Sequence, residues 1–233
     1  MLRKLMFGAV VCMGGVALAA PDAKDDVASA AKKLTDASNY SWKQTTEGGF
    51  GGGEQTGKTE KDGYTVLNMT FGDNTIQIAK KGEKAAIKAD DSWKTPEELG
   101  GPDAQPGPGM FIANMVKSFK APGTMAMESI AKLKEVKKDG DDYTAVLTGE
   151  DASNTMPRFG RRGGGAPPQL QNGKVELKIS VKEGVLSKFT MHITGTMSRG
   201  GNDIDIDRTT VTEISDVGST KIELPEEAKK KLE

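Results

Sequence analysis

Cysteine and histidine are nearly absent from the sequence, which contains one of each among 233 residues. Zinc sites, reactive thiols and catalytic triads need several such side chains in one place, so the composition argues against all three. It predicts no metal site, no cofactor and no catalytic residue. Aromatic residues make up 5% of the chain and hydrophobic residues 36%, while 29 glycines add no side chain that could be buried. We therefore expect a folded domain with a lean core.

An excess of one charge is also lacking, since 32 Lys and Arg residues face 33 Asp and Glu residues. Nonspecific nucleic-acid binding depends on a cationic surface, so we expect no nucleic-acid partner. Beyond the N-terminal apolar run, no hydrophobic stretch approaches the roughly 20 residues of a membrane-spanning helix. The sequence therefore predicts no transmembrane segment in the mature chain.

The N-terminal apolar run is typical of an export signal. Arg3 and Lys4 precede an apolar stretch over residues 5–18, and Ala17 and Ala19 supply the small residues at the −3 and −1 positions of a cleavage site. We predict a signal peptide over residues 1–19 and a periplasmic or secreted mature chain. Cys12 lies inside the apolar stretch after a valine, whereas lipid attachment needs a small residue before the cysteine. The mature chain has no other cysteine, so disulfides play no part in the prediction.

Apolar and polar residues alternate along most of the mature chain, as they do in strands with one buried face. Turn signals such as Asp62-Gly63, Lys81-Gly82 and Asp139-Gly140 separate these segments at short spacing, which predicts antiparallel hairpins. We expect about ten strands in one sheet. The clearest are residues 40–43, 64–71, 74–81, 84–90, 134–138, 143–148, 174–182, 186–197 and 202–214.

Helical spacing of apolar residues predicts helices over residues 22–37, 110–120, 125–133 and 226–232, and Thr95-Pro96-Glu97-Glu98 resembles a helix start. Three Gly/Pro-rich segments are expected as loops. The alternation of apolar and polar residues indicates that one face of the sheet contacts solvent and the other is buried. The predicted helices are the elements that can pack on the buried face. We therefore predict one α+β domain over residues 20–233, with helices covering the concave face of a strongly curved, incomplete barrel. The expected loops are residues 47–57, 100–109 and 157–173.

The order of these elements resembles the superfamily of periplasmic lipoprotein carriers and mycobacterial lipid-carrier lipoproteins. Residues 64–88 with Trp93 after them, and residues 173–228 ending in Leu224-Pro225-Glu226-Glu227-Ala228, carry the resemblance. Members have a half-barrel closed by helices, with a cavity for acyl chains or other lipids, so the resemblance implies a lipid or another hydrophobic small molecule as ligand. An arginine latches the lid of the lipoprotein-sorting carrier. Here no arginine lies between Lys4 and Arg158, so that latch cannot be placed.

Apolar residues of the predicted strands and helices would line such a cavity, and the methionines among them suit an adaptable apolar surface. A plain filled core would use the same residues, so both interpretations stay open. The candidate residues from the strands are Leu67, Met69, Phe71, Ile76, Ile78, Ile87, Val175, Leu177, Ile179, Val181, Phe189, Met191 and Ile193, and those from the helices are Phe111, Met115, Phe119, Met125 and Met127.

Three acidic residues alternate with isoleucines at Asp203, Asp205 and Asp207. A calcium loop that began there would need a glycine and a glutamate where Arg208 and Ile214 stand. Alternation with isoleucine instead predicts the wet face of a strand. The sequence therefore predicts no metal site at these carboxylates.

Two glycine-rich segments suggest other ligands. The glycines of residues 48–53 are not followed by the Gly-Lys-Ser/Thr of a phosphate-binding loop, so we expect a flexible hairpin loop. Arg158, Arg161 and Arg162 with their glycines resemble one copy of an RNA-binding tract. We expect a mobile surface loop there, or a contact for an acidic lipid head group or a partner.

The single histidine, His192, alternates with Met191 and Ile193 on a predicted strand and should face outward. No nucleophile or carboxylate stands at a recognisable spacing from it, so a catalytic role is unsupported.

Three classes of function remain. The first is an exported, non-enzymatic protein that binds a hydrophobic ligand between sheet and helices, with residues 110–133 as a lid. The second is a secreted structural or interaction module with a filled core, whose loops contact envelope proteins. The third, a hydrolase, would need a clustered carboxylate pair in a cleft.

Overall fold

The computed structural model describes residues 22–49, 52–61, 63–71, 74–89, 91–101, 107–155, 170–199 and 202–233. The predicted signal peptide and the arginines at 158, 161 and 162 lie outside these ranges. The side chain of Phe71 is also outside the description, although its backbone belongs to a strand.

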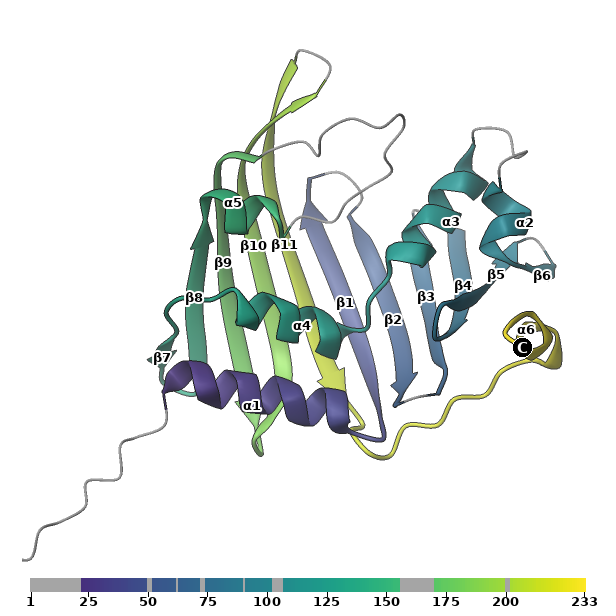
Figure 1. The fold of residues 1–233 in the computed structure, drawn as a ribbon, viewed down its shortest axis with the longest axis horizontal. Coiled ribbons are helices and arrows are strands. Elements are labelled where there is room, and N and C mark those ends of the chain that lie inside the picture. Colours follow the sequence, from purple (N-terminus) through teal and green to yellow (C-terminus); the bar gives the residue numbers. More distant parts are fainter. Residues whose placement is uncertain are drawn as a thin grey trace, which may run out of the picture.

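The described residues form one antiparallel sheet of eleven strands, in the spatial order β6-β5-β4-β3-β2-β1-β11-β10-β9-β8-β7 (Figure 1). Two meanders therefore meet where the first strand pairs with the last, while β6 and β7 form the two open edges. The α+β incomplete barrel predicted from the alternation is confirmed. The strands are β1 (Asn39–Gly48), β2 (Gly53–Glu60), β3 (Thr65–Phe71), β4 (Asn74–Lys81), β5 (Lys84–Ala89), β6 (Ser92–Lys94), β7 (Lys137–Asp139), β8 (Asp142–Thr148), β9 (Leu170–Lys182), β10 (Val185–Arg199) and β11 (Asn202–Ser215).

The three predicted loops are shorter in the structure than the sequence suggested. The loop expected over residues 47–57 is shorter, because β1 continues to Gly48 and β2 begins at Gly53. The loops expected to end at residues 109 and 173 also end earlier, since helix α3 begins at Pro108 and β9 at Leu170. In each case pairing or packing with a neighbouring element outweighs the local preference of glycine and proline for turns.

Helices α1 to α5 lie on one face of the sheet, which we call the inner face (Figure 1). Local signals explain their starts: Asp22 accepts a hydrogen bond from the backbone of Lys24, and Thr95 and Glu98 form a capping box. None of the described helices has the length and hydropathy needed to cross a bilayer. The helices are α1 (Ala23–Asp36), α2 (Pro96–Gly100), α3 (Pro108–Ser118), α4 (Pro122–Ala131), α5 (Gly149–Ser153) and α6 (Glu226–Lys231).

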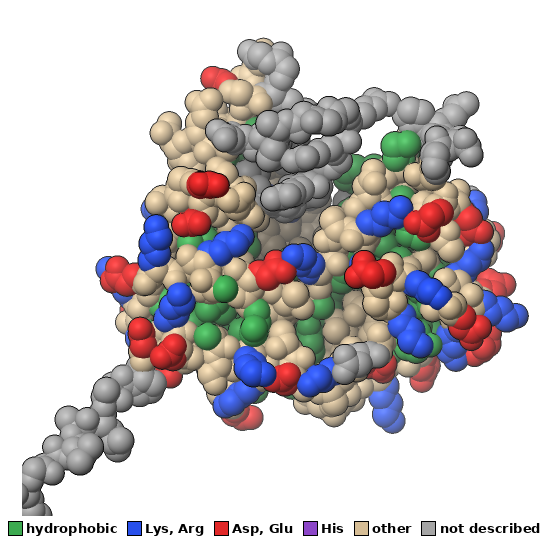
Figure 2. All heavy atoms as spheres, in the orientation of Figure 1, with side chains coloured by type: hydrophobic (Ala, Val, Ile, Leu, Met, Phe, Trp, Pro, Cys, Tyr) green, Lys and Arg blue, Asp and Glu red, His purple; other side chains and the backbone are tan. Residues whose placement is uncertain are grey.

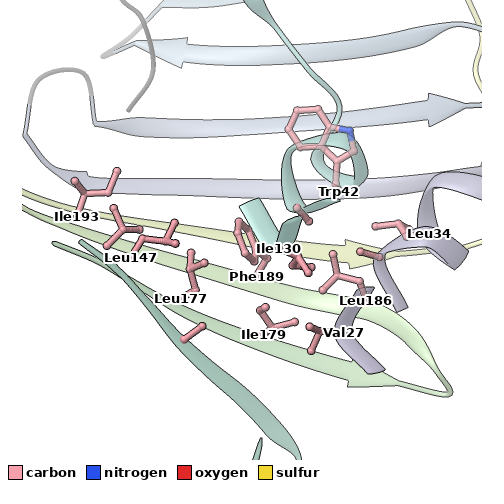
Figure 3. Packing of buried hydrophobic residues seen from close by; sticks show 14 of the residues in the cluster. Val27, Leu34, Trp42, Ile130, Leu147, Leu177, Ile179, Leu186, Phe189 and Ile193 are labelled. Atoms are coloured by element: carbon pink, nitrogen blue, oxygen red, sulfur yellow. The ribbon is translucent and has the colours of Figure 1, made fainter. Parts of the chain in front are cut away.

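The main core lies between the inner face and helices α1 and α4 (Figure 3). Strand register places Ile179 beside Phe189 and Val175 beside Ile193, so their side chains form one apolar surface. Val27 and Leu34 of α1 and Ile130 of α4 pack onto it and are almost completely buried. The alternation read from the sequence therefore produces a packed sheet-and-helix layer.

Helix α6 lies on the opposite, outer face. Its Ala228 and the following Leu232 pack in a separate small cluster with Ala79, Ala86 and Trp93. These three residues occupy outward positions of β4, β5 and β6. The chain thus covers part of both faces, although most of its helices are on the inner one.

Candidate ligand-binding face

The predicted lining residues of the strands share the inner face. Register pairs Leu67 with Ile78 and Ile78 with Ile87 at one side of the sheet, and Leu177 with Met191 at the other. The two groups are separated by β2, β1 and β11. Tyr40 and Trp42 of β1 lie between these two apolar patches, and all of these residues belong to one hydrophobic cluster.

Burial divides the candidates into three groups. Val175, Leu177 and Ile179 are at most 2% exposed and belong to the packed core under the helices. Phe111 and Met127 point into solvent, with 46% and 38% of their surface exposed. The other fully buried candidates are Leu67, Met69, Ile78, Ile87, Phe189 and Ile193, and those of intermediate exposure are Ile76, Met115, Phe119, Met125, Val181 and Met191.

Part of the inner face between the two apolar patches is polar. We call this region the middle strip and define it by six inward side chains of β2, β1 and β11. Thr46 and Thr210 share a hydrogen bond of 3.3 Å between their hydroxyl oxygens, and the Thr212 hydroxyl donates to Oε1 of Gln44 at 3.3 Å. The residues of the middle strip are Gln44, Thr46, Gln55, Arg208, Thr210 and Thr212.

Most of the middle strip lies between two helical covers (Figure 1). Helices α1, α4 and α5 lie over the β8–β11 side and helices α2 and α3 over the β3–β5 side, whereas no described helix lies over the upper part of β11, β1 and β2. Figure 2 shows a hollow on this face between the two covers. The structure thus leaves, between packed apolar walls, a region in which Gln44, Gln55, Arg208 and Thr210 are half-buried, and we call it the partly open region. Thr46 and Thr212 beside it are only 6% and 3% exposed.

Trp42 lies under Phe119, the residue that ends α3, and is only 3% exposed. Its ring stacks on Phe119 with centroids 5.9 Å apart, and its Nε1 donates to the Thr59 hydroxyl at 3.3 Å. The ring lies across Gly57 of β2, where an added Cβ would be 2.3 Å from Trp42 Cζ2. The glycine in β2 is therefore what allows the indole to lie flat on the sheet.

Lys80 holds the end of α3 against the sheet. Its ammonium group donates to the carbonyl oxygens of Val116 at 2.9 Å and Phe119 at 3.4 Å, both at the C-terminal end of the helix. Burial lowers the pKa of Lys80, and the charge of Glu83 opposes that shift. A cation at this place also complements the negative end of the helix dipole. Sequence reasoning did not single out Lys80.

Arg208 is the one basic residue of the middle strip. It stands opposite Ile193 on β10 and Gly48 on β1, and its side chain is half-buried. Burial lowers the pKa of the Arg208 guanidinium, although that group remains charged at neutral pH. Its aliphatic stem lies beside Gly49, where an added Cβ would be 3.4 Å from Arg208 Cβ. Gly48 and Gly49 both have positive φ, and a Cβ at Gly48 would lie 2.2 Å from the Asp207 carbonyl oxygen, so the backbone itself requires glycine there.

The outer face is densely charged, and His192 belongs to it as predicted. Two carboxylates contact its ring: Nε2 lies 2.8 Å from Oδ1 of Asp207, and Nδ1 lies 3.3 Å from Oε2 of Glu176. The partners come from β11 and β9, so no spacing along the sequence could reveal them. The hydrogen bond to Asp207, followed by the one to Glu176, raises the pKa of His192 against the effect of burial.

The three alternating aspartates lie on the same outer face, where a wet strand face was predicted. Thr196 donates to Asp205 at 3.0 Å, Ser198 donates to Asp203, and Asp207 contacts His192. Each carboxylate thus has a partner on β10. Among the described residues no group of three or more His, Cys, Asp or Glu side chains is placed to hold a metal ion.

A cleft of about 520 Å³ lies on the outer face beside the segment that leads to α6. Thr56, Lys58 and Asn68 line it together with Lys221 and Glu223, and the Lys58 ammonium donates to the Lys221 carbonyl at 3.1 Å. Trp42, Val66 and Ile222 also line it, so its lining is mixed polar and apolar.

The fold is similar to two solved structures. LprF from Mycobacterium bovis aligns over 90% of this chain and 98% of its own, with 11% sequence identity and a TM-score of 0.46. The LolA superfamily protein NE2245 from Nitrosomonas europaea aligns over 88% and 96%, with 12% identity and a TM-score of 0.31. No protein-family model and no curated protein matches the chain.

Proposed function

We propose that the protein is an exported, non-enzymatic binding protein that holds a lipid, an acyl chain or another hydrophobic small molecule against the inner face of the sheet. The observation that carries the proposal is the partly open region between the two helical covers. Its border is formed by half-buried, flexible apolar side chains, including Met115, Phe119, Met125 and Met191. Methionines adapt to ligands of different shape, and burial of apolar area supplies about 25 cal/mol per Å².

The fully buried residues of the inner face limit where a ligand can bind, because a ligand cannot contact them. Val175, Leu177 and Ile179 lie under α1 and α4 and are not available to a ligand in this conformation. We therefore place the ligand over the middle strip, with its apolar part toward Met191 on one side and Phe119 on the other. Helices α3 and α4 act as the lid. A wider opening would require residues 119–121 to separate from Trp42 and Lys80, which contact them.

Tryptophan fluorescence tests this position, because one of the two tryptophans of the sequence lies on each face. In Trp93→Phe the remaining Trp42 reports on the inner face, and in the matched control Trp42→Phe the remaining Trp93 reports on the outer face. Titration with oleic acid should change the emission of Trp93→Phe and leave that of Trp42→Phe constant. Equal responses in both variants would place the ligand elsewhere.

Mass spectrometry of lipids extracted from protein purified out of the cell envelope provides an independent test. A co-purified amphiphile in stoichiometric amount is expected, and N-terminal sequencing of the same sample should begin at Ala20. If no lipid co-purifies and neither tryptophan responds to oleic acid, the proposal fails. The second interpretation, an interaction module with a filled core, would then be favoured by the full burial of Val175, Leu177 and Ile179.

A further inference from the structure

The C-terminal segment of the chain runs from the end of β11 across the sheet to α6 (Figure 1). We call residues 216–233 the strap. The hydroxyl oxygens of Ser41 and Thr220 lie 2.8 Å apart, and the ammonium group of Lys58 donates to the Lys221 carbonyl at 3.1 Å. Both partners of the strap occupy outward positions of β1 and β2. The first part of the strap is therefore fixed to the outer face by hydrogen bonds.

Helix α6 docks on the outer face through a cluster that is separate from the main core. Ala228 and Leu232 are 0% and 3% exposed, and they pack on Ala79, Ala86 and Trp93. Ala79 and Ala86 are register partners on β4 and β5, and their short side chains let the helix lie close to the sheet. A helix of six residues is too short to be stable alone, so α6 depends on this docking. Because the cluster is small, undocking of α6 costs less than unfolding of the main core.

Strand β6, at one open edge of the sheet, depends in turn on the docked helix. Three register pairs hold β6 to β5. Its aromatic side chain, Trp93, is 8% exposed and packs in the cluster with α6. Helix α2 follows β6 directly, because Thr95 is the residue that caps it. A shift of β6 would therefore move the start of α2.

An ion pair also joins α6 to α2 at this edge. Nζ of Lys231 lies 2.7 Å from Oε1 and 2.9 Å from Oε2 of Glu98. The same carboxylate accepts a hydrogen bond of 2.6 Å from the backbone N–H of Thr95, so it belongs to the capping box of α2. The hydrogen bond from Lys231 is the largest cause of the lowered pKa of Glu98. The strap thus contacts the group that stabilises the first turn of α2.

Helices α2 and α3 pack closely enough to move together. A Cβ added to Gly100 would lie 2.9 Å from Cα of Met110 and 3.0 Å from Cβ of Ala113. Lys117 of α3 also pairs with Glu97 of α2 at 2.9 Å. These two helices form the cover of the β3–β5 side of the inner face (Figure 1). A continuous series of contacts therefore connects the strap on the outer face with a cover on the inner face.

We propose that the strap is a conformational device that holds β6 and the α2–α3 cover in place, so that undocking of α6 from the outer face releases the cover on the inner face. Coupling of this kind is reciprocal, so a loosened cover also favours undocking of α6. The inference goes beyond the proposed function and requires no ligand. It places control of an inner-face cover on the opposite face of the sheet.

Hydrogen exchange of the full chain, followed by mass spectrometry, tests the coupling without a ligand. Leu232→Ala truncates the larger of the two side chains that anchor α6, and we expect exchange in α6 to become about tenfold faster. Exchange in α2 and α3 should accelerate by about threefold or more, whereas exchange in α1 and α4 of the main core should change less than about twofold. Gly100→Ala forces α2 and α3 apart, so it should in turn accelerate exchange in α6.

Lys231→Gln separates the ion pair from the docking of α6. Because exposed pairs contribute little, exchange in α2 should accelerate about threefold, and exchange in α6 should change less. Lys230→Gln is the matched control, since Lys230 is the neighbouring exposed residue of the same helix; it should leave both helices unchanged.

Two results would overturn the inference. If Leu232→Ala accelerates exchange in α6 but not in α2 and α3, the strap does not hold the cover. If it accelerates exchange in α1 and α4 to the same extent, α6 does not undock separately from the main core. Either result leaves the proposed function unaffected, because that function is tested by the tryptophan response to oleic acid.

Discussion

The inner face of the sheet contains two kinds of surface, and they differ in what lies above them. Under helices α1 and α4 the inward residues are aliphatic and almost fully buried, as Ile179 at 0% exposure illustrates. In the middle strip, the inward residues are threonine, glutamine and arginine. Both surfaces come from strands with the same alternation of inward and outward positions. Aliphatic inward residues therefore lie under helices, whereas the polar inward residues of the middle strip lie mostly where no described helix packs on the sheet.

This difference has a physical basis. A polar group under a helix would lose its hydration and would need a partner in the packed layer, whereas apolar side chains gain from burial there. In the middle strip the hydroxyl and amide groups satisfy one another across β1 and β11. The sheet thus combines a packed aliphatic part with a polar part in which Gln44, Gln55, Arg208 and Thr210 remain half-buried.

The largest expected effect tests the packed part. Ile179→Ala removes a side chain with 0% exposure and leaves a cavity, so we expect the free energy of unfolding to fall by about 3 kcal/mol. Thr210→Ala in the middle strip removes one hydrogen bond and should lower it by about 1 kcal/mol or less. Chemical denaturation measures both. Equal losses would show that the two surfaces are packed alike.

A second substitution acts where the two surfaces meet. Gly57→Ala would place a Cβ 2.3 Å from Trp42 Cζ2, so the indole must tilt and its stack with Phe119 must open. We expect a loss of about 2 kcal/mol in the free energy of unfolding and a red shift of Trp42 emission in the Trp93→Phe background. Adding Trp42→Phe to Gly57→Ala should recover part of the loss, because the smaller ring needs less room. No recovery would locate the strain elsewhere in β2.

A third substitution loosens the cover of the β3–β5 side. Lys80→Met removes the donor to the Val116 and Phe119 carbonyls, and we expect a loss of about 1 kcal/mol in the free energy of unfolding. Hydrogen exchange should accelerate at the C-terminal turn of α3. Lys88→Met on the outer face of β5 is the control and should stay within about 0.5 kcal/mol. If the exchange rates of α3 remain constant, Lys80 does not hold the helix.

The smallest expected effect concerns the outer face. His192 is the single histidine of the sequence, so its imidazole can be titrated by NMR without overlap. The hydrogen bond to Asp207 raises its pKa above the usual 6.5 of a histidine side chain. The stabilisation is therefore complete below pH 6.5 and is lost as the pH rises through the folded-state pKa. Because the side chain is 35% exposed, the contribution should stay below about 1 kcal/mol.

The control for this prediction is His192→Gln. The difference in the free energy of unfolding between the unsubstituted protein and this variant should be greatest near pH 6 and shrink toward pH 8. A histidine pKa at or below 6.5, or a difference that grows with pH, would contradict the contacts with Asp207 and Glu176. Inner-face ligand binding should be the same in both proteins, which separates the two faces functionally.

The packed part of the fold was largely predictable from local pattern. Strand β4 begins and ends at the predicted residues 74 and 81, and Thr95 caps α2 as its motif indicates. Strand β2 was missed, because Gly53 and Gly57 make it look like a loop. It is a strand only through its pairing with β1 and β3. Helix α5 and the three-residue β6 were missed for a similar reason, since short elements depend on their neighbours.

The candidate site was predictable only in part. Alternation identified Met191 and Leu67 as inward residues, and register confirms that they share a face. Threonines and glutamines carry no such signal, because polar residues in a strand are expected to face water. The middle strip therefore depends on the pairing of β11 with β1, which the sequence does not indicate. Gly48 and Arg208 are separated by most of the chain yet are register partners.

By itself, the sequence determined which residues alternate, where most helices begin and how few chemically reactive side chains exist. These properties depend on neighbours within a few positions, and local sterics and hydrogen bonding decide them. Only the tertiary structure decided that two meanders join at β1 and β11, that Arg208 lies on the inner face among neutral residues, and that His192 has two carboxylate partners. Such contacts depend on the register of strands far apart in the chain, which forms when the whole inner face is buried at once.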